Sequence, residues 1–190
     1  MIAEIKKDTL FYDESNGGIT FSGGEPLIKL DFLLALLQSC KESDIHTAVD
    51  TCGYAPLHDF QKIIHFVDLF LYDVKIWDEK LHQKYTGVSN RLIHDNLKYL
   101  SEGSCRIIIR IPLIPRIVDI EDNITKLIDF ISGLKNIVQI NLLPYNKIGE
   151  SKYEKLGRPF LMGEIEIQTD EKIEQLTQLF SKTGFPLIKG

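Results

Sequence analysis

Short apolar runs alternate with longer amphipathic stretches along the whole chain. The apolar runs, rich in β-branched residues, predict β-strands, and the stretches with apolar residues at three- and four-residue intervals predict α-helices. Strands are expected over residues 19–21, 45–51, 68–75, 106–113 and 137–143, with a short terminal strand over 185–188. Helices are expected over residues 1–13, 31–40, 56–65, 77–85, 92–100, 121–132 and 170–182.

The alternation of strands with helices indicates parallel βαβ units with right-handed crossovers. The run over 68–75 is apolar at both odd and even positions, which is typical of a strand buried on both faces. We expect Asp31 to cap a helix, and Pro112 to mark the point where the hydrogen-bond ladder of its strand ends. The pattern leaves two architectures open, a doubly wound sheet and a segment of a (β/α) barrel.

The composition is that of one globular domain. The chain has 190 residues, of which 44% are hydrophobic and 26% charged, so we expect a single domain over residues 1–190. A net charge of -5 makes nucleic acid and anionic membranes poor partners. No apolar run approaches the roughly 18 residues of a membrane span, and residues 1–7 lack the apolar centre of a signal peptide. We therefore expect a cytoplasmic protein.

The cysteines and histidines form no metal-binding pattern. Cys40, Cys52 and Cys105 are too widely spaced for a zinc site, an iron–sulfur site or a disulfide framework. Free cysteines are commonly buried, so we expect these to be small residues in or near the core. The five histidines form no pair with the spacing of helical metal ligands. We assign no metal to either residue type.

Polar residues close the predicted strands at their carboxyl ends. They are Gly23-Gly24-Glu25, Asp50-Thr51, Asp73 with Lys75, Arg110, and Tyr145-Asn146. Ligands of parallel α/β sheets and barrels bind at that end of the strands. We therefore expect these residues to converge on one binding site.

Asp50 and Asp73 close neighbouring predicted strands, so their carboxylates could share a cation or an ammonium group. Lys75 is the candidate ammonium group, because its two-residue offset from Asp73 places both side chains on one face of the strand. Arg110 could pair with a carboxylate, or could cap the sheet with its aliphatic stem packed. The alternative to a ligand site is a structural network of salt bridges at the rim of the sheet.

Glu25 and Asn146 each admit two interpretations. Glu25 follows two glycines and precedes a proline, where its carboxylate and the nearby backbone could hold a ligand's amino group. The same residues could instead form a tight turn between a strand and a helix. Asn146 could hydrogen-bond an adenine or a ribose, or could serve as an ordinary turn residue. The glycine spacing matches neither the dinucleotide fingerprint nor the phosphate-binding loop.

Several segments, in order along the chain, resemble the motifs of a known family. They are residues 17–26 (GGITFSGGEP), 49–54 (VDTCGY), 73–75 (DVK), 86–90 (TGVSN) and 142–147 (LLPYNK). The chain resembles the glycyl-radical-enzyme activating enzymes of the radical S-adenosylmethionine superfamily. Each motif alone is modest, but the ordered series covers essentially the whole chain. The resemblance implies an α/β fold, a partial (β/α) barrel of the radical SAM type with about five βα units around a parallel sheet.

The resemblance also implies an activity and its cofactors. Members of this family bind S-adenosylmethionine to a 4Fe-4S cluster and cleave it reductively to a 5′-deoxyadenosyl radical. That radical abstracts hydrogen from a backbone glycine of a glycyl radical enzyme such as pyruvate formate-lyase. Flavodoxin or ferredoxin would be the electron donor. The partner would thus be a protein, with no role for nucleic acid or membrane.

By the same resemblance, S-adenosylmethionine would be bound by residues at the strand ends: Gly23, Gly24, Glu25, Asp50, Asp73, Val74, Lys75, Arg110 and Asn146. Gly24 and Glu25 would meet the methionine amino group, and Lys75 would contact the methionine carboxylate. Asn146 falls where the type member has histidine, and an amide can still donate and accept hydrogen bonds.

A monovalent cation is the other ligand that the resemblance implies. It would lie near the methionine carboxylate, held by Asp50, Thr51 and Asp73. Arg110 matches a family arginine at the mouth of the barrel. No residue of this chain is assigned a catalytic role.

One family motif does not occur in the chain. Cys-x-x-x-Cys-x-x-Cys, which supplies three cluster ligands in the family, is absent, and the three cysteines are too dispersed to replace it. We therefore expect the chain to be the C-terminal part of an activating enzyme, without the first βα unit and the cluster loop. On its own, the chain should generate no radical.

Two other functions stay open at this point. The chain could be a non-catalytic fragment that keeps only the fold or the surface on which the partner docks. It could also be a barrel lyase or aldolase that uses Lys75 as an amine nucleophile. The motif order gives no reason to expect that second chemistry.

Overall fold

A computed structural model of the chain describes residues 1–147, 157 and 165–190. Its centre is one sheet of six parallel strands in the order β1-β2-β3-β4-β5-β6. The strands are β1 (Ile19–Phe21), β2 (Thr47–Thr51), β3 (Leu69–Asp73), β4 (Arg106–Leu113), β5 (Ile137–Pro144) and β6 (Leu187–Lys189). The possible strand over 185–188 is therefore β6, parallel to β5.

The strand order decides between the two architectures that the sequence left open. A doubly wound sheet reverses its direction of winding at a switch point, so its strands do not follow chain order. Here every strand pairs with the next one in the chain, as in a (β/α) barrel, and β1 and β6 remain as two separate edges. The fold is thus a partial barrel that does not close, as the motifs implied.

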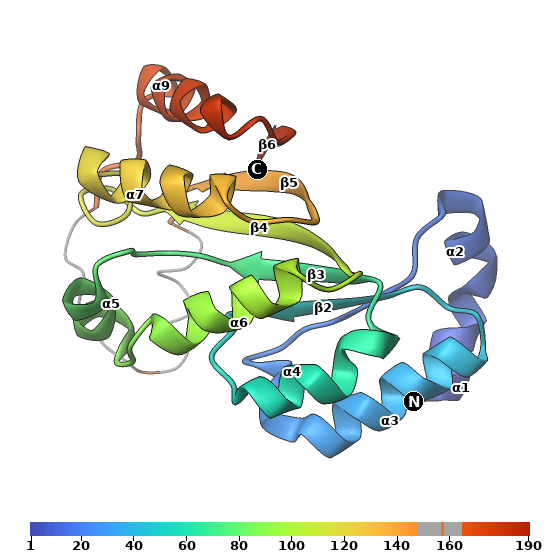
Figure 1. Ribbon diagram of the computed structural model, residues 1–190. Coiled ribbons are helices and arrows are strands. Elements are labelled where there is room, and N and C mark those ends of the chain that lie inside the picture. Colours follow the sequence, from blue (N-terminus) through green and yellow to red (C-terminus); the bar gives the residue numbers. More distant parts are fainter. Residues whose placement is uncertain (148–156, 158–164) are drawn as a thin grey trace.

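The helices lie mainly on one side of this sheet. Figure 1 shows α3, α4, α6 and α7 side by side along one face, with α5 near the carboxyl ends of the strands. The helices are α1 (Ile2–Ile5), α2 (Thr9–Ser15), α3 (Leu30–Glu42), α4 (Leu57–Ile63), α5 (Glu79–Thr86), α6 (Arg91–Ser101), α7 (Glu121–Ser132) and α9 (Asp170–Phe180). The short 3-10 helices are η1 (Lys6–Asp8), η2 (Pro26–Lys29), η3 (Ile64–Phe66) and η4 (Ser181–Thr183).

The hydrophobic core fills the space between the sheet and these helices. On β3, Phe70 and Tyr72 are fully buried there, whereas Leu69, Leu71 and Asp73 on the opposite face are half-buried. Strand β4 alternates in the same way. The expectation that residues 68–75 are buried on both faces was therefore wrong for the described part of the chain. The face away from the helices is the more open one, and we call it the open face of the sheet.

Two predicted ends also differ from the structure. Asp31 lies in the first turn of α3 and does not cap it, because η2 brings Lys29 to the N-cap position. Glu25 caps η2 instead, accepting a hydrogen bond from the backbone N–H of Leu27 at 3.4 Å. Pro112 does not end its strand: it pairs in register with Leu143, and pairing continues at Leu113.

Candidate active site

The open face carries a row of polar side chains near the carboxyl ends of the central strands. Strand register places Asp73 on β3 opposite Arg110 on β4, and Arg110 opposite Asn141 on β5. Paired residues of adjacent strands point to the same side, so these side chains share the open face with Asp50 of β2. In the predicted site, Asp50, Asp73 and Arg110 are therefore brought together.

Arg110 is the centre of this cluster. Its Nε donates to Asp73 Oδ1 at 2.8 Å, and its two terminal nitrogens donate to both carboxylate oxygens of Asp50. The three side chains are only 21–24% exposed, so water screens their charges weakly. Burial alone would lower the pKa of the guanidinium, but the two carboxylates outweigh it and raise that pKa. Arg110 thus stays charged and offsets the repulsion between the two carboxylates that it bonds.

Lys75 and Ser22 extend the cluster on either side. Lys75 Nζ lies 3.2 Å from Asp73 Oδ2, and the Ser22 hydroxyl donates to Asp50 Oδ2 at 3.1 Å. The predicted pairing of Lys75 with Asp73 is therefore present. The expectation that Lys75 joins the two carboxylates was wrong, because the longer, forked side chain of Arg110 does so from the next strand.

The Glu25 carboxylate has hydrogen-bond partners within the chain. One oxygen accepts from the Thr51 hydroxyl at 2.8 Å, and the other accepts from the backbone N–H of Cys52 at 2.9 Å. Together with the bond from Leu27, these contacts tie the ends of β1 and β2 to each other. Glu25 therefore links these two strand ends, and its contact with a ligand's amino group, through the carboxylate or the neighbouring backbone, stays a prediction.

The two glycines before Glu25 offer such a backbone. Gly23 has φ of 144°, a conformation that side chains rarely adopt. A Cβ placed on Gly23 or Gly24 would meet no atom within 4 Å, so a ligand has room to approach both peptide groups. The site thus combines open peptide groups on β1 with charges of both signs on β2, β3 and β4.

Three further predicted residues lie differently from this cluster. The Thr51 side chain is buried with Glu25 on the other side of β2, so its hydroxyl does not join the two aspartates. Val74 is buried, and its backbone N–H donates to the carbonyl of Arg110 at 2.9 Å. Asn146 is exposed just beyond the end of β5, at the carboxyl edge of the sheet.

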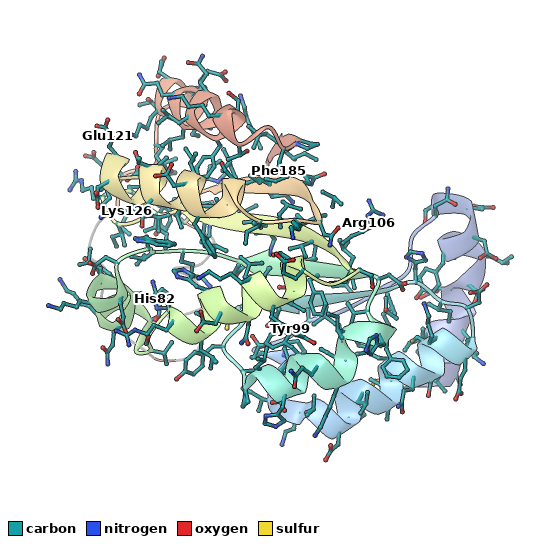
Figure 2. All side chains as sticks on the ribbon, viewed as in Figure 1. His82, Tyr99, Arg106, Glu121, Lys126 and Phe185 are labelled. Atoms are coloured by element: carbon teal, nitrogen blue, oxygen red, sulfur yellow. The ribbon has the colours of Figure 1, made fainter. Side chains whose placement is uncertain are left out.

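The two ends of the sheet are far apart. Arg106 begins β4 at the amino edge, whereas His82 on α5 lies beyond the carboxyl edge (Figure 2).

The segment 86–90 is fixed by hydrogen bonds at this carboxyl edge. His82 is buried, and its Nδ1 lies 2.8 Å from the carbonyl of Val88, within that segment. Asn90 in that segment donates to the carbonyls of Ile76 and Trp77 at 2.9 and 2.6 Å. This segment therefore fixes the loop that follows Lys75.

Sequence reasoning missed Asn96, a buried residue of α6. Its Nδ2 donates to the carbonyls of Gly53 and Ala55, each at 2.8 Å, and so holds the loop that follows β2. That loop supplies the N–H of Cys52 to Glu25, which makes Asn96 an indirect support of the glycine turn. The available signal was a polar residue among the apolar positions of an amphipathic helix.

The cysteines do not fit an iron–sulfur cluster. Cys40 and Cys105 are buried at separate places in the core, and Cys52 is half-buried. Burial raises the pKa of all three thiols, that of Cys105 to about 11, whereas cluster ligands must be thiolates. Within residues 1–147, 157 and 165–190, no three Cys, His, Asp or Glu residues gather as metal ligands. S-adenosylmethionine fits better, since Lys75 can pair with its carboxylate and the space beside Gly23 and Gly24 leaves room for its ammonium group.

A parallel partial barrel with a Gly-Gly-Glu turn and this charged cluster defines the class of protein. Residues 2–130 match the Radical SAM superfamily, and the chain belongs to that superfamily. Within it, the relatives are activating enzymes of the pyruvate formate-lyase type, which confirms the family predicted from the motifs.

Two curated relatives illustrate this similarity to activating enzymes. The trans-4-hydroxy-L-proline dehydratase activating enzyme of Clostridioides difficile is 44% identical over 188 residues, which cover 97% of this chain and 62% of that enzyme. The pyruvate formate-lyase-activating enzyme of Clostridium pasteurianum is 38% identical over 166 residues, 87% of this chain and 69% of that enzyme. The chain therefore spans less than two thirds of the length of the first relative.

The fold has known counterparts as well. A crystallised domain of a pyruvate-formate lyase-activating enzyme from Bacteroides vulgatus superposes with a TM-score of 0.77 at 31% identity, covering 92% of this chain and 99% of that domain. SuiB from Streptococcus suis shares the fold alone, with a TM-score of 0.69 at 18% identity, over 99% of this chain and 43% of SuiB.

None of the helices in the described residues is long and apolar enough to cross a membrane.

Proposed function

We propose that this chain is the C-terminal part of a glycyl-radical-enzyme activating enzyme and forms one wall of its S-adenosylmethionine site. The observation that carries the proposal is the cluster of Asp50, Asp73, Lys75 and Arg110 on the same sheet end as the open Gly23-Gly24 turn. S-adenosylmethionine would supply the 5′-deoxyadenosyl group that abstracts hydrogen from a glycine of a protein partner.

The residues of this chain would bind and orient that cofactor. The peptide groups of Gly23 and Gly24 would accept hydrogen bonds from the methionine ammonium group, with Glu25 fixing their position. Lys75 would meet the methionine carboxylate, beside the backbone of Val74. Arg110 would keep Asp50 and Asp73 in place, and Asn146 would contact the nucleoside.

A monovalent cation at Asp50, Thr51 and Asp73 is a finer part of the proposal. Arg110 already lies between the two carboxylates, so a cation would have to share them with the guanidinium. Thr51 would offer its backbone carbonyl, since its hydroxyl is bonded to Glu25. Binding of S-adenosylmethionine that tightens with added potassium would support this site, and binding independent of potassium would remove it.

The 4Fe-4S cluster would be held by residues outside this chain, because the three cysteines of the chain do not fit such a cluster. The 190 residues alone would then be inactive. The chemistry needs the reducing conditions of the cytoplasm, where flavodoxin or ferredoxin would reduce the complete enzyme.

The second candidate function is that of a non-catalytic fragment that only docks the partner, and it is compatible with the same fold. A lyase with Lys75 as nucleophile draws no support from the geometry, because an ion-paired ammonium group has no free electron pair.

The test compares this chain with a protein extended by the residues encoded upstream of Met1. After anaerobic reconstitution with iron and sulfide and addition of dithionite, the extended protein should form 5′-deoxyadenosine, and the 190-residue chain should not. An extended protein that binds iron but forms none would overturn the proposal. In the extended protein, Lys75→Ala should weaken S-adenosylmethionine binding about tenfold, whereas Lys126→Ala, on the outer surface of α7, should not.

A further inference from the structure

Two primary amides lie beside the charged cluster and take no part in it. Gln139 and Asn141 are two residues apart on β5, so both face the same side of the sheet. Register pairs Gln139 with Ile108 and Asn141 with Arg110, which places both on the open face. Both are half-buried, so neither is an ordinary surface residue.

The hydrogen bonding of this pair is incomplete. Gln139 Nε2 donates to Asn141 Oδ1, which leaves Gln139 Oε1 and the Asn141 amide hydrogens with no hydrogen bond in the described part of the chain. Exchanging nitrogen and oxygen in both side chains would leave the same remainder, one donor and one acceptor. Neither group is fully buried, so water can reach both, and a ligand that pairs the donor and the acceptor together would displace that water without leaving either group unpaired.

We propose that Gln139 and Asn141 recognise one peptide unit of the protein substrate. A peptide unit offers one C=O and one N–H, which complement the free amide donor and the free carbonyl acceptor. The amides are neutral and lie next to the half-buried Ile108, which suits an uncharged backbone with small or apolar neighbours. A carboxylate or phosphate would select a cation at these positions instead.

This inference rests on the proposed function, since it assumes that the substrate is a polypeptide, and it assigns to β5 the contact that aligns it. An adenine ring also presents a donor and an acceptor to a paired amide. The test therefore has to separate peptide from nucleoside. Neither arm needs a cluster or a radical, so its result is independent of the activity assay.

The measurement is nuclear magnetic resonance of the 15N-labelled 190-residue chain. The probes are the blocked peptide acetyl-Ala-Val-Gly-Val-Ala-amide, the same peptide with N-methylglycine at its centre, and adenosine. We expect the first peptide to shift the side-chain NH2 signals of Asn141 and Gln139. The N-methylglycine peptide, which lacks the central N–H, should bind about tenfold more weakly, as expected for the loss of a hydrogen bond.

Isosteric variants complete the test. Gln139→Met and Asn141→Leu should each weaken peptide binding about tenfold, while Gln61→Met, the same change on the exposed side of α4, should not. Unchanged backbone spectra away from β5 would show that the variants fold. No shift of either amide up to the solubility limit of the peptide, equal binding of the N-methylated peptide, or shifts with adenosine alone would each overturn the proposal. Peptide binding by the 190-residue chain, together with an extended protein that binds iron but forms no 5′-deoxyadenosine, would overturn the activity and leave this contact standing.

Discussion

Arg110 shows how a single side chain can decide the character of a site. Asp50 and Asp73 lie on adjacent strands with little solvent around them, and two such carboxylates repel each other unless a cation lies between them. The guanidinium bonds to both and leaves Lys75 with one partner. Lys75 is thus the more available cation of the two for an anionic ligand.

Removal of Arg110 should destabilise the protein. In Arg110→Met the two carboxylates lose their shared partner, and we expect the free energy of unfolding to fall by about 2 kcal/mol, less than for a fully buried pair. Urea unfolding at neutral pH measures this. Lys126→Met, which breaks an exposed pair with Asp122, should change the free energy by under about 0.5 kcal/mol. Equal effects of the two variants would contradict the central role of Arg110.

His94 should make the stability depend on pH. It stacks on Trp77 with 4.8 Å between ring centres, and burial, followed by the nearby His82 and Lys98, lowers its pKa from 6.5 to about 4. Between pH 6.5 and about 4, His94 binds a proton only in the unfolded chain, so the free energy of unfolding should fall as the pH drops through this range.

The expected loss is about 2 kcal/mol, reduced because the ring is partly exposed. Comparison of urea midpoints for the parent and His94→Gln across this range isolates the histidine from other titrating groups. The difference between the two proteins should be constant above pH 7 and shrink toward pH 4. Parallel profiles over the whole range would show that His94 does not carry the effect.

At the scale of elements, the loop after β2 is packed against β3 without spare room. Gly53 has φ of 77°, and a Cβ there would lie 1.8 Å from the hydroxyl oxygen of Tyr72. That hydroxyl donates to the carbonyl of Ile93 on α6 at 2.7 Å, so Tyr72 cannot move aside cheaply. The loop therefore depends on glycine for both its conformation and its packing.

Gly53→Ala should cost at least about 3 kcal/mol of stability, from left-handed strain and the clash together. Gly87→Ala is the matched control, because Gly87 has φ of 84° at the end of α5 and open space around it. It should cost only about 1 kcal/mol, the strain alone. Thermal or urea unfolding of both variants tests the difference. Similar losses of stability would mean that the Tyr72 side chain shifts to accommodate the new methyl group.

At the scale of the whole molecule, one continuous core runs from Ile5 near the amino end to Phe180 in α9. Every neighbouring pair of strands is hydrogen-bonded, so among the described residues no strand lies apart from the sheet. A single core of this kind favours cooperative unfolding.

We therefore expect one unfolding transition for the 190-residue chain, in keeping with a single domain over residues 1–190. Urea unfolding followed by far-ultraviolet circular dichroism and by the fluorescence of Trp77, the sole tryptophan, should give the same midpoint. Two separated transitions would instead divide the chain into independent units.

Much of the site could be predicted from the sequence. The residues at the strand ends were found because apolar runs end where polar residues begin, and parallel strands bring those ends to one edge. Partners were harder to predict. Arg110 bonds to Asp73 and Asp50 over separations of 37 and 60 residues, and Glu25 is occupied by Thr51 and Cys52. Such pairs depend on side-chain reach across strands, which spacing along the chain does not encode.

The sequence by itself determined the alternation of strands and helices, the family, and the residues that close each strand, because periodicity and motifs are local properties of the chain. The tertiary structure alone decided the order of the strands, the open face of the sheet, and the choice of Arg110 over Lys75 as the link between Asp50 and Asp73. It also placed Gln139 and Asn141 beside that cluster. The physical reason is register: the alignment of one strand against the next sets which side chains meet.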